Sequence, residues 1–175
     1  SADSSHGIGL VGGVSNQMIR AYGFYSDERG SDRKFPGGYI DSTSYDRQVY
    51  GLGAGLKHGN SEWDLELRRQ ETGPTGNPPF AMDIDYVKTD FARLRFETKF
   101  ADTTMALAFG YSDVSHGMNN FGQRPPPPMT TRYRYTTASG TTHTVALDFS
   151  TPLGTGELEY GFEDQRVCND DQAHK

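Results

Sequence analysis

The strongest constraint in this sequence is an alternation of apolar residues with small or polar ones, repeated in segment after segment. In the segment 103–112 every second residue is apolar: Met105, Leu107, Phe109 and Tyr111. The segment 144–149 repeats the pattern with Val145, Leu147 and Phe149. Successive side chains of a strand point to opposite sides, so a period of two predicts strands that each have one apolar face.

The composition excludes two classes of protein. No uninterrupted apolar run approaches the roughly 18 residues that a transmembrane helix needs, so a helical membrane protein is excluded. The formal net charge of −6, without any basic stripe, argues against a nucleic-acid partner. Cys168 is the one cysteine, so no internal disulfide can form.

Eight segments carry the alternation, which predicts an all-β, antiparallel protein of about eight strands. They are residues 8–14, 18–24, 48–56, 62–68, 92–100, 104–112, 144–149 and 157–163. Their connections alternate strictly between short turns, near residues 16, 59, 102 and 153, and long ones. Such connections are typical of an up-and-down β-barrel.

The side opposite the apolar one is charged or nearly bare glycine, which is unlike the packed interior of a soluble sandwich. Val49, Gly51, Gly53 and Gly55 form one such side, and Glu62, Asp64, Glu66 and Arg68 form another. Transmembrane barrels have this pattern, with lipid outside and a polar lumen inside. We therefore predict an outer-membrane barrel that contacts lipid, with external loops at 27–46, 71–88 and 113–141 and a loop-like tail at 165–175. Four tyrosines near strand ends are candidates for an interfacial girdle: Tyr22, Tyr50, Tyr111 and Tyr160.

Both ends of the chain are expected on the outer side, whereas complete bacterial barrels normally begin and end in the periplasm. We therefore expect a segment of a larger barrel. An eight-stranded closed barrel, acting as a membrane anchor or ligand-binding module, is the alternative. Pairing between 8–14 and 158–162 distinguishes them, because only the closed barrel requires it.

The long loop after residue 112 holds the candidate site. His116 and Met118 share the parity of Ala106, Ala108 and Gly110, so an extended strand points both side chains to the lumen. An imidazole and a thioether two residues apart can reach one ion, and the soft thioether favours copper over calcium, magnesium or manganese. A His-x-Met pair also occurs by chance, in which case both side chains are simply solvated.

Several segments are similar to barrel segments of the TonB-dependent copper receptors, and the similarity covers about residues 5 to 164. These segments are His6-Gly-Ile-Gly-Leu-Val-Gly-Gly-Val14, Asp90-Phe-Ala-Arg-Leu-Arg-Phe-Glu97 and Gly110-Tyr-Ser-Asp-Val-Ser-His-Gly-Met-Asn-Asn-Phe121. Arg124-Pro-Pro126 and Arg132-Tyr-Arg134 also fit. The region 110–134 is the most specific part.

The resemblance implies that residues 1–175 are part of a 22-stranded barrel in the bacterial outer membrane, which in that family encloses an N-terminal plug. It implies copper as the transported substrate, bound on the external side by a His-x-Met pair of the barrel with a Cys and a Met of the plug. His116 and Met118 match that pair. The plug domain and TonB are the implied partners. A receptor of this architecture for another substrate, such as a siderophore, remains the alternative.

Other residue groups favour a structural role. Charges on neighbouring strands, around Arg93, Arg95 and Glu97, are expected to pair with one another. Pro125 to Pro128 predict a stiff spacer, and Met129 is a possible soft contact for a passing ion. Ser112, Asp113 and His116 lie too close in sequence to form a catalytic triad, and we predict no enzyme activity.

Overall fold

A computed structural model describes residues 5–40, 43–77, 79–124 and 132–174. It contains one antiparallel sheet of eight strands in the order β1-β2-β5-β6-β7-β8-β9-β10, so every strand pairs with the next one of the sheet along the chain. The strands are β1 (Ser5–Ser15), β2 (Ile19–Gly30), β5 (Tyr45–His58), β6 (Ser61–Thr72), β7 (Asp83–Phe100), β8 (Thr103–Asn119), β9 (Tyr135–Leu153) and β10 (Gly156–His174). The predicted all-β, up-and-down fold of eight strands is confirmed.

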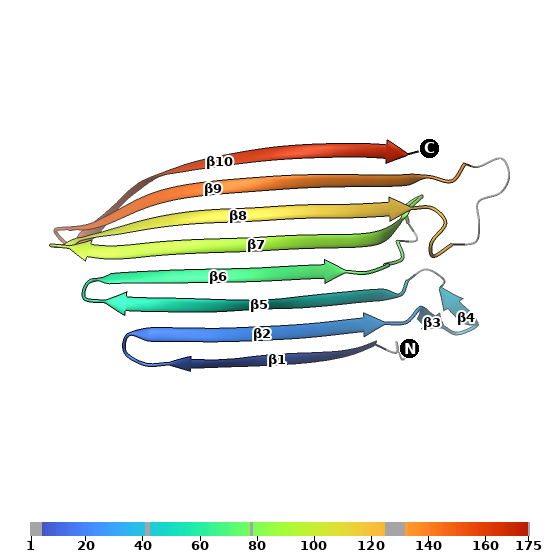
Figure 1. Cartoon of the computed structure of the whole chain (residues 1–175), viewed down its shortest axis with the longest axis horizontal. Coiled ribbons are helices and arrows are strands. Elements are labelled where there is room, and N and C mark those ends of the chain that lie inside the picture. Colours follow the sequence, from blue (N-terminus) through green and yellow to red (C-terminus); the bar gives the residue numbers. More distant parts are fainter. Residues whose placement is uncertain (1–4, 41–42, 78, 125–131, 175) are drawn as a thin grey trace.

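Short turns lie at one end of the sheet, and long connections lie at the other end with both ends of the described chain (Figure 1). Each turn sits where the sequence predicted it. Gly59 and Gly154 adopt positive φ angles of 59° and 62°, and Ala101 adopts 52°. Positive φ angles let a tight turn follow the twist of the flanking strands. A small hairpin, β3 (Arg33–Phe35) and β4 (Gly38–Ile40), lies in the first long connection.

The strands are longer, and the loops shorter, than the sequence pattern indicated. Described connections span 31–44, 73–82 and 120–134 rather than 27–46, 71–88 and 113–141. The expected loop-like tail at 165–175 was also wrong for residues 165–174, which continue β10 against β9. In these regions the apolar alternation stops, but the backbone ladder continues and charged side chains pair across it, as Arg47 does with Glu28 at 2.8 Å.

The sheet is open. β1 and β10 form its two edges and share no contact in the part of the chain that the structure describes. The closed eight-stranded barrel is therefore wrong, because it requires those strands to pair.

The large apolar side chains do not form a core. None of the described hydrophobic residues is buried, and many are exposed, including Leu10 at 63% and Phe162 at 67%. The alternation gathers most of them on one side of the sheet, which we call the band face. The apolar band on it comprises Ile8, Leu10, Val14, Ile19, Leu52, Leu56, Trp63, Leu65, Leu67, Leu94, Phe96, Leu107, Phe109, Val145, Leu147, Phe149, Leu158 and Phe162.

The apolar band slants across the sheet. On β1 it begins at Ile8, whose register leads from strand to strand to Asp170 on β10. On β10 its first large apolar residue is Phe162, eight positions nearer the turns. A shift of eight residues at about 3.3 Å each, across seven strand spacings of about 4.8 Å, is a slant of about 40°. The band therefore runs perpendicular to a barrel axis only if the strands are tilted from that axis by this angle.

Along the strands towards the loops, the band face changes from apolar to polar. Tyr50 and Tyr111 lie near this change, which agrees with the predicted girdle positions. Tyr160 lies on the band face nearer the turns and stacks on Phe149 with ring centroids 5.2 Å apart.

No described helix has the length and apolar character to cross a membrane.

Tyr22 was wrongly included among the girdle candidates, because it lies on the opposite face. There the side chains of Arg20, Tyr22 and Phe24 lie over Gly55, Gly53 and Gly51, their partners on β5. The glycine stripe is therefore not bare, since the absent β-carbons leave room for three large neighbouring side chains.

This packing predicts unequal effects of two glycine substitutions. A β-carbon at Gly51 would lie 2.6 Å from the backbone oxygen of Leu67 and 2.7 Å from the Phe24 ring, so the backbone must shift. We expect Gly51→Ala to lower the free energy of unfolding by about 1–3 kcal/mol. Gly9→Ala, on the same face but with open space around it, should change it by less than about 0.5 kcal/mol.

Urea unfolding of the protein in detergent micelles measures both values. Equal effects of the two substitutions would contradict the proposed packing.

Candidate functional site

His116 and Met118 lie at the loop end of β8, within the strand rather than in a flexible loop. His116 is in register with Ala138 and Met118 with Thr136 of β9. Both residues have the parity of Ala106, and the strand is continuous, so both lie on the face opposite the band.

His116 lines a shallow groove of mainly small side chains on that face. Its other lining residues are Val114, Ala138, Ser139, Gly140, Thr142 and Asn169. His116 makes no hydrogen bond or ion pair with another described residue that would hold its ring nitrogens. Its imidazole is thus available to an incoming ligand.

The pair provides two donors of different chemistry. Positions two apart on a strand have Cα atoms about 7 Å apart, so one ion can reach an imidazole nitrogen and a thioether sulfur together. The described residues contain no group of three or more His, Cys, Asp and Glu side chains that could hold a metal ion. Any ion bound by the pair therefore needs further ligands from outside this set.

Cys168 does not supply one of them. It is exposed and lies on the band face of β10, in register with Thr141. His143 also lies on the band face, where its ring packs against Tyr111 with centroids 5.3 Å apart. Asp113 has the same orientation and accepts a hydrogen bond of 2.7 Å from Thr141. Asp113 therefore faces away from His116, and the three residues 112, 113 and 116 do not form a triad.

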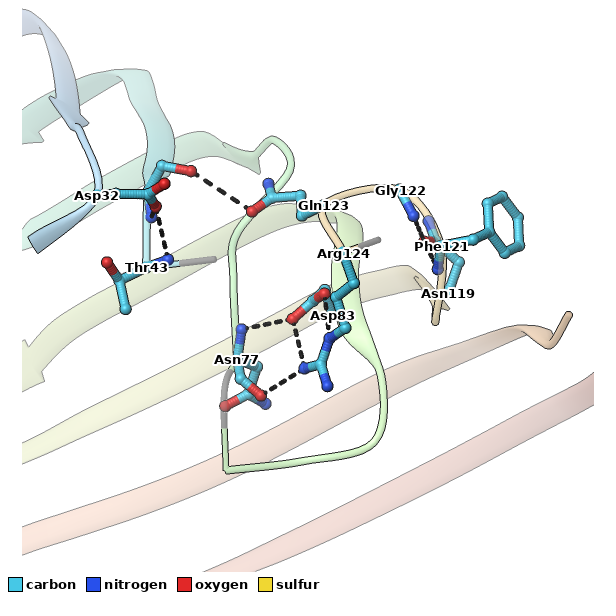
Figure 2. Close-up of polar contacts among 10 residues, drawn as sticks. Asp32, Thr43, Asn77, Asp83, Asn119, Phe121, Gly122, Gln123 and Arg124 are labelled. Atoms are coloured by element: carbon cyan, nitrogen blue, oxygen red, sulfur yellow. Dashed lines mark hydrogen bonds and ion pairs between the residues drawn. The ribbon is translucent and has the colours of Figure 1, made fainter. Parts of the chain in front are cut away.

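A buried ion pair joins two of the long connections above β8. The Asp83 side chain is only 1% exposed, and Arg124 donates to it from Nε at 2.6 Å and from Nη2 at 2.7 Å. The Asn77 amide donates to Asp83 at 2.8 Å, and its carbonyl accepts from Arg124 at 2.9 Å. Figure 2 shows this arrangement, which fixes the connection 73–82 against 120–124.

The first long connection joins the same cluster. Ser44 Oγ lies 3.4 Å from Gln123 Oε1, and the Ser44 carbonyl accepts from the Gly76 amide at 3.1 Å. Asp32 accepts from the amides of Thr43 and Ser44 at 2.8 and 2.9 Å, which closes this connection on itself. Hydrogen bonds between neighbours thus tie all three connections together, a set we call the loop cluster.

The chain reaches this cluster directly from the candidate pair. Asn119, which follows Met118, is 5% exposed, and its side-chain oxygen accepts from the Phe121 amide at 3.1 Å and from the Gly122 amide. Asn120 donates to the Arg132 carbonyl at 3.1 Å and accepts from the Arg134 amide at 2.9 Å. The end of β8 and both stems of the last loop are therefore held in place. Pro125 to Pro128 and Met129 lie outside the described residues.

Asp83 is charged under all ordinary conditions. Burial raises the pKa of its carboxyl, but hydrogen bonds from Arg124 and Asn77, together with the guanidinium charge, lower it more. The net result is a pKa below the usual 3.8 of aspartate. The pKa of Arg124 is raised, mainly by its hydrogen bonds to Asp83.

Sequence reasoning placed His116 and Met118 on one face but missed the Asp83–Arg124 pair. Asp83 begins β7, and Arg124 lies in an irregular loop with no periodicity to reveal its partner. The charged residues that the sequence predicted to pair across neighbouring strands form ion pairs with other partners. Arg20 of β2 bonds to Asp64 and lies 2.8 Å from Glu62, and Arg95 lies 2.9 Å from Glu97 of its own strand.

No protein-family model matches this chain. No curated protein matches it either. Among solved structures it is similar to the copper transporter OprC, with a TM-score of 0.84 and 15% sequence identity. The match covers 99% of this chain and 30% of that chain, so this chain spans less than a third of the transporter's length. At this identity the likeness shows the fold.

The Asp83–Arg124 pair makes a first prediction about the loop cluster. Arg124→Met leaves a buried carboxylate without its partner, which should make opening of the cluster easier by about 3 kcal/mol. Chymotrypsin should then cut faster beside Phe80, Phe121 and Tyr133. Arg132→Met is the control, because Arg132 is exposed and forms no ion pair with a described residue. Equal cleavage of both variants would remove this role of Arg124.

The second prediction concerns pH. Because the Asp83 pKa is lower in the folded cluster than in an opened one, the carboxylate contributes stability that is complete above about pH 5. This contribution is lost as pH falls below the usual 3.8 and through the folded pKa. Hydrogen exchange of residues 73–82, corrected for intrinsic rates, should be constant from about pH 7 to 5 and faster below about pH 4. Asp83→Asn should remove this dependence; an unchanged profile in that variant would assign it to another group.

Proposed function

We propose that this chain forms part of an outer-membrane, TonB-dependent receptor barrel that takes up copper, with His116 and Met118 as copper ligands at its external end. The proposal rests on one combination: a His-x-Met pair on the inner face of a sheet whose fold is similar to that of a copper transporter. The resemblance of residues 110–134 to the copper receptors also supports it.

The apolar band supports contact with lipid. In water, a slanted band of exposed Leu, Ile, Val, Trp and Phe on a one-layer sheet would be an unsatisfied apolar surface. In a bilayer it satisfies the hydrophobic effect, provided that the band lies level with the membrane. The slant of about 40° matches the tilt of about 35–45° at which strands cross a membrane in barrels.

The open edges support a larger barrel. β1 and β10 each leave one row of backbone N–H and C=O groups without a partner strand among the described residues. Such groups cannot remain unpaired in hydrocarbon, so further strands must continue the sheet on both sides in a membrane. The face opposite the band then lines a lumen, where a plug domain moved by TonB would lie.

The orientation of the sheet supports an external position for the candidate pair. In barrels of this kind the short turns are periplasmic and the long connections external. His116 lies five residues beyond Tyr111 towards the long connections, about 16 Å along the strand. The pair is therefore beyond the hydrocarbon, where copper arrives from outside, and it lies at the lumen wall where plug residues could complete the ligand set.

The chemistry of the two donors selects for copper. A thioether is a soft ligand and contributes little to binding of hard cations such as calcium or magnesium. Zinc is disfavoured as well, since its usual ligands are thiolate, imidazole and carboxylate.

The test is copper binding to the intact protein in detergent, with matched controls on the band face. His116→Ala and Met118→Leu should each weaken copper affinity by about 100-fold or more. Loss of a direct ligand costs at least as much as loss of a residue that only orients a ligand. His143→Ala and Met105→Leu change the same residue types outside the proposed site and should have no effect. Titration of copper against a competing chelator measures all four.

Unchanged affinity in both His116→Ala and Met118→Leu would remove the copper site. If the unaltered protein binds no copper and the same variants bind a siderophore tightly, a receptor for another substrate is favoured instead.

A further inference from the structure

The long connections carry positive charge, although the chain as a whole is acidic. Residues 31–44, 73–82 and 120–134 contain five basic residues and two acidic ones, while the whole chain has a net charge of −6. Arg124 is neutralised by Asp83, and Asp32 is engaged by backbone amides. Of the two acidic residues, Asp41 lies outside the described residues.

Four basic side chains of these connections are exposed and form no ion pair with a described residue: Arg33, Lys34, Arg132 and Arg134. Two acidic groups at the neighbouring strand ends, Asp27 and Glu28, are paired. Asp27 lies 3.1 Å from Arg29, and Glu28 lies 2.8 Å from Arg47. Asp85 and Asp170, at other strand ends, form no ion pair with a described residue, so the four unpaired cations of the connections outnumber the unpaired carboxylates near them.

Exposed aromatic rings lie beside these cations. Phe121 and Tyr133 meet edge to face with centroids 5.4 Å apart, on the two stems of the last loop. The Lys34 ammonium lies 5.2 Å from the centroid of the Tyr39 ring. The loop cluster joins the connections that carry these cations and rings, and we call them together the loop surface: Arg33, Lys34, Tyr39, Phe121, Arg132, Tyr133 and Arg134.

The part of the loop surface beyond β8, which carries Arg132 and Arg134, stands too far from the apolar band to serve lipid phosphates. From Tyr111 to Asn119 the strand rises eight residues, about 26 Å along its axis and about 20 Å vertically at the tilt given above. The polar headgroup layer is only about 5–8 Å thick on each side of the hydrocarbon. A dissolved ligand is therefore the better match.

We infer that the substrate reaching this surface is not a free copper ion but copper held in a negatively charged chelate that carries aromatic rings. This inference rests on the proposed function and names its substrate class. A free copper cation is repelled by the four uncompensated cations, whereas an anionic complex is attracted, and its rings can stack on Phe121 and Tyr133.

Transfer to the pair is then a ligand exchange. The bonds from copper to the chelator break, bonds to a His116 nitrogen and to the Met118 sulfur form, and the chelator leaves with its negative charge. Copper keeps its oxidation state, so the step needs no oxidant or reductant. Neutral imidazole and thioether donate lone pairs and release no proton.

The experiment compares two aromatic cuprous complexes of opposite charge with the intact protein in detergent. Cu(I) bicinchoninate is negatively charged because of its carboxylates, and Cu(I) neocuproine is positively charged. At low ionic strength we expect about tenfold tighter binding of the bicinchoninate complex, measured by equilibrium dialysis. Raising salt to about 0.3 M should reduce this preference, since exposed charges are then screened.

The variant Arg132→Gln/Arg134→Gln should lose most of the preference, and Arg166→Gln should keep it. Arg166 is equally an exposed arginine, but it lies on the band face of β10, paired with Asp164 at 3.1 Å. Equal binding of both complexes by the unaltered protein, or an unchanged preference in the double variant, overturns the inference. Displacement of the complex by vesicles of anionic lipid also overturns it, because the surface would then serve the membrane.

Loss of bicinchoninate colour reports transfer of copper to the protein, and this reading separates the two proposals. If charge preference fails while transfer still depends on His116 and Met118, the copper site stands and the substrate class is wrong. If the charge preference holds but copper passes to the His116→Ala and Met118→Leu variants as readily as to the unaltered protein, the proposed copper site fails.

Discussion

An uninterrupted antiparallel ladder is the constraint on which the rest of this structure depends. Because the register has no shift apart from one irregularity between Ile84 and Tyr86, parity alone decides the face of each residue over almost the whole sheet. One face collects the apolar band, and the other collects charges, glycines and the candidate pair. Among the described residues no second layer covers either face, and no hydrophobic residue is buried. The hydrophobic effect therefore cannot act within this sheet and has to act between the band and its surroundings.

The sequence predicted most of the fold because the alternation and the turns are both local signals. Four turns and eight strands were found where Gly59, Gly154 and the apolar positions indicated them. Strand ends were less accurate, because hydrophobicity marks only the part of a strand that carries the band. Beyond Tyr50 and Tyr111 the ladder continues with polar side chains, such as Asp113 bonded to Thr141, and these resemble loop composition. The error at 165–174 has the same cause.

The candidate site divides in the same way into a predictable and an unpredictable part. Parity placed His116 and Met118 on one face without any knowledge of tertiary structure. Asp83 and Arg124, by contrast, come from a strand end and an irregular loop 41 residues away, and only the folded chain brings them together. Packing of the Gly51, Gly53 and Gly55 stripe under Phe24, Tyr22 and Arg20 was missed as well, because a glycine pattern does not reveal which neighbour fills its space.

The Asp83–Arg124 pair and the small residues of β8 and β9 bear on the candidate pair from two sides. The ion pair at Asp83 holds the loops directly above Asn119, so the exit of β8 is fixed and the imidazole and thioether keep their separation. Beside and below His116, the same face of β8 and β9 carries small side chains: Ala138 in register with His116, and further down Gly140, Gly110 and Ala108. Ala138 and Gly140 line the same shallow groove as His116. The candidate pair therefore lies between a strand end fixed by hydrogen bonds and a part of the sheet that carries small side chains.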